Sequence, residues 1–159
     1  MNHLQSSITL PCGAILKNRL AKAPMTERIS NSAYESTPEH EHLYKLWSQT
    51  GTGLLITGNV MIDRTHMESA GNIFFGDEAM IPKLKKWTDA GTVNGNHFWV
   101  QISHSGRQTN RFVNPYPKAP SAVKLNKLFL FGKPTAMTEA DIQELISVFQ
   151  LPAKIAKAS

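Results

Sequence analysis

The chain alternates short apolar runs with longer amphipathic segments after a hairpin-like start. Ile8 and Leu10, a Pro-Cys-Gly turn and a second apolar run ending at Leu16 predict a β-hairpin within residues 5–19. The following apolar runs predict strands, because a strand buried on both faces of a parallel sheet lacks polar alternation. These runs lie at 20–23, 54–57 and 97–102.

An amphipathic helix is predicted after each of the three runs, because apolar residues recur there at three- and four-residue spacing. The first helix lies between Thr37, which caps its free amides, and Gly51, which ends it. The second lies between residues 77 and 95. The third begins at Thr138, which forms a capping box with Asp141.

Each predicted helix has one apolar stripe that is expected to face the core. Pro152 lies inside the third helix, where it removes the hydrogen bond to Val148 and costs about 3 kcal/mol. We therefore expect that helix to kink or to end early. The three predicted stripes are Leu43, Leu46, Trp47 and Thr50; Leu84, Trp87, Thr88 and Gly91; and Ile142, Leu145, Ile146 and Phe149.

The order of these elements predicts the fold class. Strand and helix alternate three times, which indicates right-handed βα units, a parallel sheet and helices outside it, and so an α/β protein. The loops that leave the strands are long, about a dozen residues or more against a usual two to six. Function is expected at the carboxyl ends of the strands, where parallel α/β proteins have their active sites.

Composition narrows the class of protein. The 159 residues suit one domain, and 41% apolar and 18% charged residues are ordinary for a globular chain. No apolar run reaches the ~18 residues of a membrane span, and no secretory signal is visible, so we expect a cytoplasmic protein that does not bind membranes. A lone Cys12 agrees with a reducing compartment. The net charge of +5 is scattered, which does not favour a nucleic-acid partner.

Several catalytic and binding motifs are absent from the sequence. No G-x-G-x-x-G, Walker A, G-x-S-x-G or H-E-x-x-H pattern occurs. His40 and His42 are two residues apart near a helix start, so they point to different sides and make a poor metal pair. We expect no metal site, and both histidines are interpreted as solvated surface residues.

Polar residues gather at the three predicted strand ends. Neutral donors and acceptors beside a glycine suit a flat heteroaromatic ligand, because hydroxyl and carboxamide groups match ring carbonyls and N–H edges. A purely structural role for each residue taken singly is the alternative, because satisfied polar groups are common. The residues are Thr26; Thr57, Gly58 and Asn59; and Gln101, Ser103, His104 and Arg107.

The long loop after residue 102 has a second interpretation. Basic and aromatic residues alternate there, as on a nucleic-acid surface, although a solvated loop punctuated by proline is the simpler explanation. Salt-sensitive binding of nucleic acid would distinguish the two. The residues are Arg107, Arg111, Lys118, Lys124, Lys127 and Lys133, with Phe112, Tyr116, Phe129 and Phe131.

The stretches LKNRLAKAPMT, GLLITGNVMID, QISHSGRQ and GKPTAMTEADI resemble the Old Yellow Enzyme family of flavin oxidoreductases. The resemblance runs in order from Ile8 to about Ala158. It implies a TIM (β/α)₈ barrel closed below by a hairpin, with FMN as cofactor. It also implies an ene-reductase that passes hydride from NAD(P)H through the flavin to an activated alkene such as an enone, a small-molecule substrate.

The resemblance also implies roles for individual residues. Ala23, Pro24, Met25 and Thr26 match the segment along the isoalloxazine ring, with Thr26 near a flavin carbonyl and N5. Gly58 matches a small residue that contacts the ring, and Gln101 matches a glutamine that hydrogen-bonds the pyrimidine edge. His104 and Arg107 match a frequent H-x-G-R turn.

Departures from the family shape the remaining expectations. The H-G-A-H-G-Y-like segment that anchors the substrate and donates a proton has no match before Ser159, so we expect no catalytic residue within this chain. Residues 1–159 are interpreted as the incomplete amino-terminal part of one FMN-binding barrel domain, three βα units after a hairpin, because a full barrel needs at least ~200 residues. We expect a truncated chain with little or no activity alone. Self-association through an open sheet edge, or a non-catalytic half-barrel completed by a partner chain, is the alternative.

Overall fold

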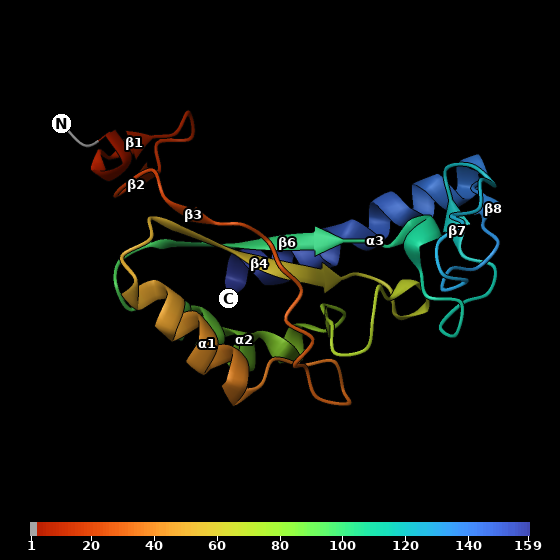
Figure 1. The fold of residues 1–159 in the computed structure, drawn as a ribbon, viewed down its shortest axis with the longest axis horizontal. Helices are drawn as coiled ribbons and strands as arrows, with labels where there is room; N and C mark the ends of the chain where they lie inside the picture. The colour runs from red at the N-terminus through yellow and green to blue at the C-terminus, as the bar shows by residue number, and fades with distance from the viewer. Residues whose placement is uncertain (1–2) are drawn as a thin grey trace.

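A parallel sheet with β4 at its centre runs through the molecule (Figure 1). The computed structural model describes residues 3–159. β3 (Ala21–Lys22) pairs with the start of β4 (Leu54–Met61), β5 (Ile73–Phe74) pairs with its end, and β6 (His97–Ser103) pairs along its other edge. All three pairings are parallel, which confirms the predicted sheet.

Three helices cover the sheet in the predicted strand–helix order. They are α1 (Pro38–Gln49), α2 (Ile81–Gly91) and α3 (Glu139–Ala158). In Figure 1, α1 and α2 lie side by side below the sheet, and α3 passes behind β6. Residues 3–159 also contain four short 3₁₀ turns, at His3–Gln5, Arg64–His66, Glu78–Met80 and Gly106–Gln108.

The predicted hairpin is present, and two strand pairings were missed. β1 (Ile8–Thr9) and β2 (Ile15–Leu16) are antiparallel and lie at the amino ends of the sheet strands. β5 lies in the loop that follows β4, and β7 (Lys118–Ala119) pairs with β8 (Thr135–Ala136) in the loop that follows β6. Two-residue strands carry no detectable periodicity, so only their partners across space define them.

The core lies between the sheet and the helices α1 and α2. Leu55 of β4 is fully buried and packs with Leu84 and Trp87 of α2, as the stripe of that helix predicts. Tyr44 joins them from α1, with ring centroids 5.1 Å from Trp87 and 5.2 Å from Phe98. These edge-on and tilted aromatic contacts add to the burial of apolar area.

The predicted buried face of α1 is only partly confirmed, because Trp47 packs against the core but the fully buried residues of the helix are others. Its buried residues are His40, Tyr44 and Ser48, whereas Leu46 is 48% exposed. The buried face contains polar groups because each finds a partner: Ser48 Oγ donates to Asn96 Oδ1, and the Tyr44 hydroxyl donates to Glu27. A hydrophobic stripe cannot reveal such a face, because its polar residues are satisfied only by distant parts of the chain.

His40 is also a correction, because the side chain predicted at the surface is 1% exposed. Its Nδ1 accepts a hydrogen bond from the Thr37 backbone N–H at 3.2 Å, so histidine serves as the third residue of a capping box. Its ring packs edge-on against Trp87 at 5.3 Å. His42 is exposed, as expected.

The third helix departs from prediction in two ways. Ile142 and Ile146 are 40% and 53% exposed, because the first half of α3 extends past the end of β6 and so beyond the four-stranded sheet (Figure 1). The helix also continues to Ala158, so the early ending at Pro152 is wrong. Pro152 and Ile155 are the buried residues of the helix, and their packing offsets the lost hydrogen bond. The capping box of Thr138 and Asp141 is confirmed.

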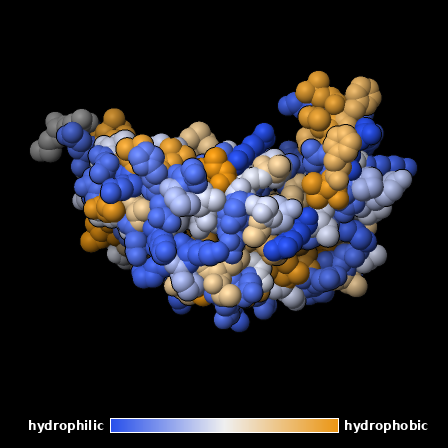
Figure 2. Space-filling model, turned by 90° about the horizontal axis from the view of Figure 1, so that it is seen from below, coloured by the Kyte–Doolittle hydropathy of each residue, from blue (hydrophilic) through white to orange (hydrophobic). Residues whose placement is uncertain are grey.

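The surface seen from the side of α1 and α2 is mostly hydrophilic, with an apolar protrusion at the end where the loop between β6 and α3 lies (Figure 2). Phe112 and Phe129 in this loop are each 83% exposed. Arg111 lies 5.2 Å from the Phe112 ring centre. Within residues 3–159, no helix is long and apolar enough to span a bilayer.

Candidate functional site

Polar side chains from three strand ends and one loop form a single hydrogen-bonded row, which we call the strand-end row. It consists of Thr26, Asn59 and Gln101, which follow or end strands, and Glu68 in the loop after β4. Thr26 Oγ1 donates to Glu68 Oε2 at 3.0 Å, and Asn59 Nδ2 donates to the same oxygen at 2.8 Å. Gln101 Nε2 donates to Asn59 Oδ1 at 2.5 Å. Asn59 and Gln101 are direct neighbours in the β4–β6 register. The strand ends therefore meet as predicted, and the row carries both donors and acceptors.

The segment Ala23–Met25 lies beside this row. All three residues are exposed and uncharged, so they offer a surface of small and apolar groups after β3. Gly58 holds the segment close to β4: a Cβ built there would lie 2.3 Å from the Met25 carbonyl oxygen and 2.7 Å from Thr26 Cα. Only glycine permits this approach. The bulge between Ile56 and Asn59 marks the same place in the register.

Glu27 anchors the far end of the segment in the helical layer. Its Oε1 accepts a hydrogen bond from the Tyr44 hydroxyl at 2.7 Å and lies 3.4 Å from Lys22 Nζ. Lys22 also donates to the Ile56 carbonyl at 2.8 Å, and its ammonium lies 4.4 Å from the Trp47 ring centre. Burial lowers the pKa of Lys22, and the nearby Glu27 opposes this shift. Burial also raises the pKa of Tyr44, so its hydroxyl remains a donor.

Replacing Tyr44 by phenylalanine is expected to lower the free energy of unfolding by about 2 kcal/mol. The change removes a hydrogen bond to a carboxylate and leaves Glu27 with a poorer partner in a nearly buried position. Urea unfolding at pH 7 measures the loss. Tyr116→Phe is the matched control, because Tyr116 is 65% exposed. Equal stability of the two variants would contradict the anchoring role.

Asp63, His66 and His104 form a second cluster beyond the carboxyl ends of β4 and β6. Their ligand atoms lie within 4.8 Å of one another, which is close enough for a metal ion. However, His66 Nε2 accepts from the Lys118 backbone N–H at 2.9 Å, so its proton is on Nδ1, 2.5 Å from Asp63 Oδ2. The backbone amide of Lys118 therefore decides which nitrogen of His66 is protonated.

His104 follows the same pattern. Its Nδ1 accepts from the Gly106 backbone N–H at 3.2 Å, which leaves the proton on Nε2, 3.9 Å from the same Asp63 oxygen. Burial lowers the pKa of His104 to about 4, so the ring is neutral at pH 7. Burial by itself would raise the pKa of Asp63, but hydrogen bonds from His66 and Thr65 lower it to about 2. The cluster is therefore a carboxylate facing two ring N–H groups.

The structure brings Thr26, Gly58 and Gln101 together but separates the H-x-G-R residues from them. The His104 ring stacks on His66 with centroids 4.3 Å apart. Arg107 is exposed in the 3₁₀ turn after β6. Among the described residues, no hydrogen bond joins either side chain to the strand-end row. Sequence reasoning missed Glu68, whose only signal is its position in the long loop after β4.

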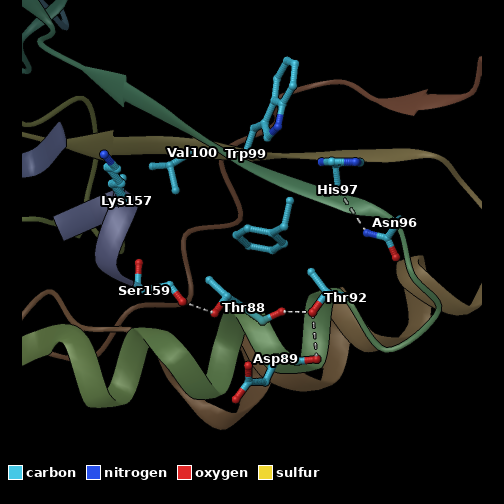
Figure 3. A pocket seen from close by; sticks show the side chains of 11 residues that line it. Thr88, Asp89, Thr92, Asn96, His97, Trp99, Val100, Lys157 and Ser159 are labelled. Carbon is cyan, nitrogen blue, oxygen red and sulfur yellow. Dashed lines mark hydrogen bonds between the residues drawn. The ribbon is translucent and has the colours of Figure 1, made fainter. Parts of the chain in front are cut away.

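A separate cleft lies between α2, the start of β6 and the end of α3 (Figure 3). Its volume is about 630 Å³, and it contains no predicted site residue. The Thr88 hydroxyl donates to the Ser159 carbonyl across it at 2.8 Å, while Trp99 points away on the other side of β6. Within the part of the chain that is described, β6 pairs with β4 alone, so this cleft follows from a free sheet edge.

A parallel α/β sheet with polar side chains at the carboxyl ends of its strands is the arrangement in which barrels and doubly wound α/β proteins place their ligand sites. The chain belongs to the NADH:flavin oxidoreductase / NADH oxidase family, whose sequence profile matches residues 8–159. FMN is the cofactor of this family, and NAD(P)H is its reductant.

Two curated relatives illustrate the sequence similarity. The chain is 31% identical to the NADH-dependent flavin oxidoreductase iccE of Talaromyces variabilis over 176 residues, which covers 99% of this chain and 42% of that protein. It is 34% identical to the NADH-dependent flavin oxidoreductase nadA of Aspergillus parasiticus over 149 residues, which covers 83% of this chain and 33% of that protein.

Solved structures show the same fold. The old yellow enzyme homologue from Zymomonas mobilis superposes with a TM-score of 0.85 at 20% identity, covering 98% of this chain and 45% of that one. A 2-naphthoyl-CoA reductase superposes with a TM-score of 0.89 at 20% identity, covering 98% and 25%. The fold is thus part of a TIM barrel, and the chain spans less than half the length of each of these four relatives.

Proposed function

We propose that this chain supplies the ring-binding strands of an FMN-dependent oxidoreductase of the Old Yellow Enzyme type. The observation that carries the proposal is the convergence of Thr26, Gln101 and Ala23–Met25 beside Gly58 at the strand ends. The corresponding whole protein would transfer hydride from NAD(P)H to an activated alkene, with bound FMN as the carrier of that hydride.

The donor set of the strand-end row fits a flavin ring. Within the described chain, no hydrogen bond uses Gln101 Oε1, so its carboxamide has an acceptor and a second N–H available for an imide edge. The uncharged Ala23–Met25 surface would lie along the ring face. Gly58 keeps that surface close to β4. Together these residues orient the ring and exclude water from one side of it.

The row contains no group suited to protonate a substrate carbon. The Thr26 hydroxyl already donates its hydrogen bond to the Glu68 carboxylate, and Gln101 is a neutral amide. We therefore assign this chain, as the first three βα units of a barrel, to cofactor binding. The proton donor, substrate anchors and phosphate loops belong to strands that follow in the family.

Flavin titration of the purified chain tests this proposal. Binding is measured by the quenching of flavin fluorescence. Because the proposed contacts are to the ring and not to the phosphate, the dissociation constants of FMN and of lumiflavin, which lacks the phosphate, should be similar. Gln101→Ala should weaken both about tenfold, since it removes hydrogen bonds with a net value of about 1 to 1.5 kcal/mol. Gln150→Ala, at an exposed glutamine of α3, is the control.

Three results would argue against the proposal. No quenching at millimolar flavin would exclude ring binding. Preference for FMN over lumiflavin by a hundredfold would place the phosphate site in this chain. Flavin retained through gel filtration, with alkene-dependent NADPH oxidation, would show that these residues suffice for catalysis.

Association with a partner chain or a second copy is the alternative proposal. The exposed Trp99 (42%) and the free edge of β6 support it, because an unpaired strand edge invites pairing. Co-purification of a chain that supplies further barrel strands would support this alternative. A monomer in sedimentation at micromolar concentration would exclude self-association.

A further inference from the structure

Glu68 is the common acceptor of the strand-end row. Its Oε2 accepts hydrogen bonds from Thr26 Oγ1 at 3.0 Å, Asn59 Nδ2 at 2.8 Å and Asn72 Nδ2 at 3.4 Å. The three donors come from three different segments: the loop after β3, the strand β4 and the loop before β5. One carboxylate oxygen therefore holds these segments in a single arrangement.

The loop that carries Glu68 is itself tightly held. Asn72 is 1% exposed, and its Oδ1 accepts from the Ser69 backbone N–H at 2.7 Å. Asn72 Nδ2 also donates to the Asn59 backbone carbonyl at 3.3 Å, and Ser30 Oγ donates to the Asn72 carbonyl at 2.8 Å. These bonds fix the backbone on the carboxyl side of Glu68, so the position of the carboxylate is determined by the fold.

An ionised carboxylate only accepts hydrogen bonds, and this sets the direction of every bond in the row. Thr26 must donate to Glu68, so only its lone pairs remain for a ligand. Asn59 must turn its amide nitrogen to Glu68 and its oxygen to Gln101. Gln101 then gives one N–H to Asn59 and keeps its carbonyl oxygen free.

We propose that Glu68 is a positioning residue that sets the hydrogen-bond polarity of Thr26 and Gln101 and biases the site against the reduced flavin. This inference rests on the proposed FMN binding. The bias is electrostatic: the reduced ring is the more negative form, and a carboxylate linked to the row by direct hydrogen bonds repels it. Glu68 acts through its neighbours and its charge, and takes no part in hydride transfer.

Three variants separate charge from geometry. Glu68→Gln keeps the size and removes the charge, whereas Glu68→Asp keeps the charge and withdraws the acceptor by one methylene. Glu78→Gln makes the same charge change at an exposed position and serves as the control. Dissociation constants for oxidised and, without oxygen, chemically reduced FMN are measured for each, after circular dichroism has confirmed folding.

Glu68→Gln is expected to change the ratio of the oxidised and reduced dissociation constants about tenfold in favour of the reduced form. That tenfold change corresponds to a rise of about 30 mV in the reduction potential of the bound two-electron flavin couple. Glu68→Asp should keep the ratio near that of the unsubstituted chain while weakening both forms several-fold. Glu78→Gln should change neither quantity.

Two results would overturn the role of Glu68. One is a ratio of oxidised to reduced dissociation constants that is the same for Glu68→Gln as for Glu78→Gln. The other is a shift of that ratio by Glu68→Asp that is as large as the shift by Glu68→Gln. Should Glu68→Gln fail to fold, the aspartate variant alone still decides, because unweakened binding by it removes the geometric part of the proposal. Absence of flavin binding by the unsubstituted chain is a separate outcome, which refutes the proposed function and this role with it.

Discussion

Alanine at position 58 is expected to cost on the order of 3 kcal/mol of stability and to abolish flavin binding. The new Cβ would lie 2.3 Å from the Met25 carbonyl oxygen and 2.6 Å from Glu27 Oε2. The Glu27 carboxylate cannot move away easily, because its other oxygen, Oε1, accepts a hydrogen bond from the Tyr44 hydroxyl. The Ala23–Thr26 segment must then move away from β4, and overpacking of this kind costs about 1 to 3 kcal/mol. Thermal unfolding, with a fall of about 10 °C, and flavin titration measure the two effects.

The control for this substitution is Gly13→Ala in the β1–β2 turn. Gly13 has φ +88°, and nothing lies within 4 Å of a Cβ built there. Alanine is strained at this position, so we expect a loss of about 1 kcal/mol from backbone conformation alone and no effect on flavin. Equal losses in the two variants, or intact flavin binding by Gly58→Ala, would show that the close approach at Gly58 is unimportant.

Acidification from pH 6.5 to about 4 is expected to destabilise the protein by on the order of 2 to 3 kcal/mol for each of two histidines. Burial lowers the pKa of His40 to about 4, with Glu27 and Glu39 opposing, and burial likewise lowers the pKa of His104 to about 4. Between pH 6.5 and 4 the unfolded chain therefore binds more protons than the folded one. The free energy of unfolding therefore decreases as the pH is lowered across that range. Protonation of His40 would also break its bond from Thr37.

Urea unfolding at several pH values between 7 and 4 measures this dependence. His40→Gln and His104→Gln should each flatten the curve, whereas His42→Gln, at an exposed position, should leave it unchanged. Below about pH 4 a further loss is expected from Asp63, whose pKa of about 2 in the folded chain makes its stabilisation disappear as it is protonated. A flat stability profile between pH 6.5 and 4.5 would contradict the burial of both rings.

Much of the fold is predictable from local pattern. The hairpin, β4, β6 and the caps at Thr37 and Thr138 each depend on residues within a few positions of one another. The buried face of α1 was not predictable, because Tyr44 becomes a core residue only through Glu27, Trp87 and Phe98, which come from other segments. Pattern reasoning assigns polar residues to the surface unless a partner is known.

The candidate site, like the fold, was only partly predictable from local sequence pattern. Thr26, Gly58 and Gln101 were expected together because the carboxyl ends of parallel strands share one edge of the sheet. His104 stands close to Gln101 in sequence, yet it points to Asp63 and His66 instead of the strand-end row. Glu68 carries no motif, and its importance appears only when three donors meet at one oxygen.

The sequence by itself determined the order of strands and helices, the edge of the sheet where the polar strand-end residues meet, and membership of the flavin oxidoreductase family. These follow from periodicity and from short motifs, which are local properties of the chain. Only the tertiary structure decided which polar groups are buried, which way each hydrogen bond runs and which residues share the site. Those depend on contacts between residues tens of positions apart, where the direction of one bond at Glu68 sets the next.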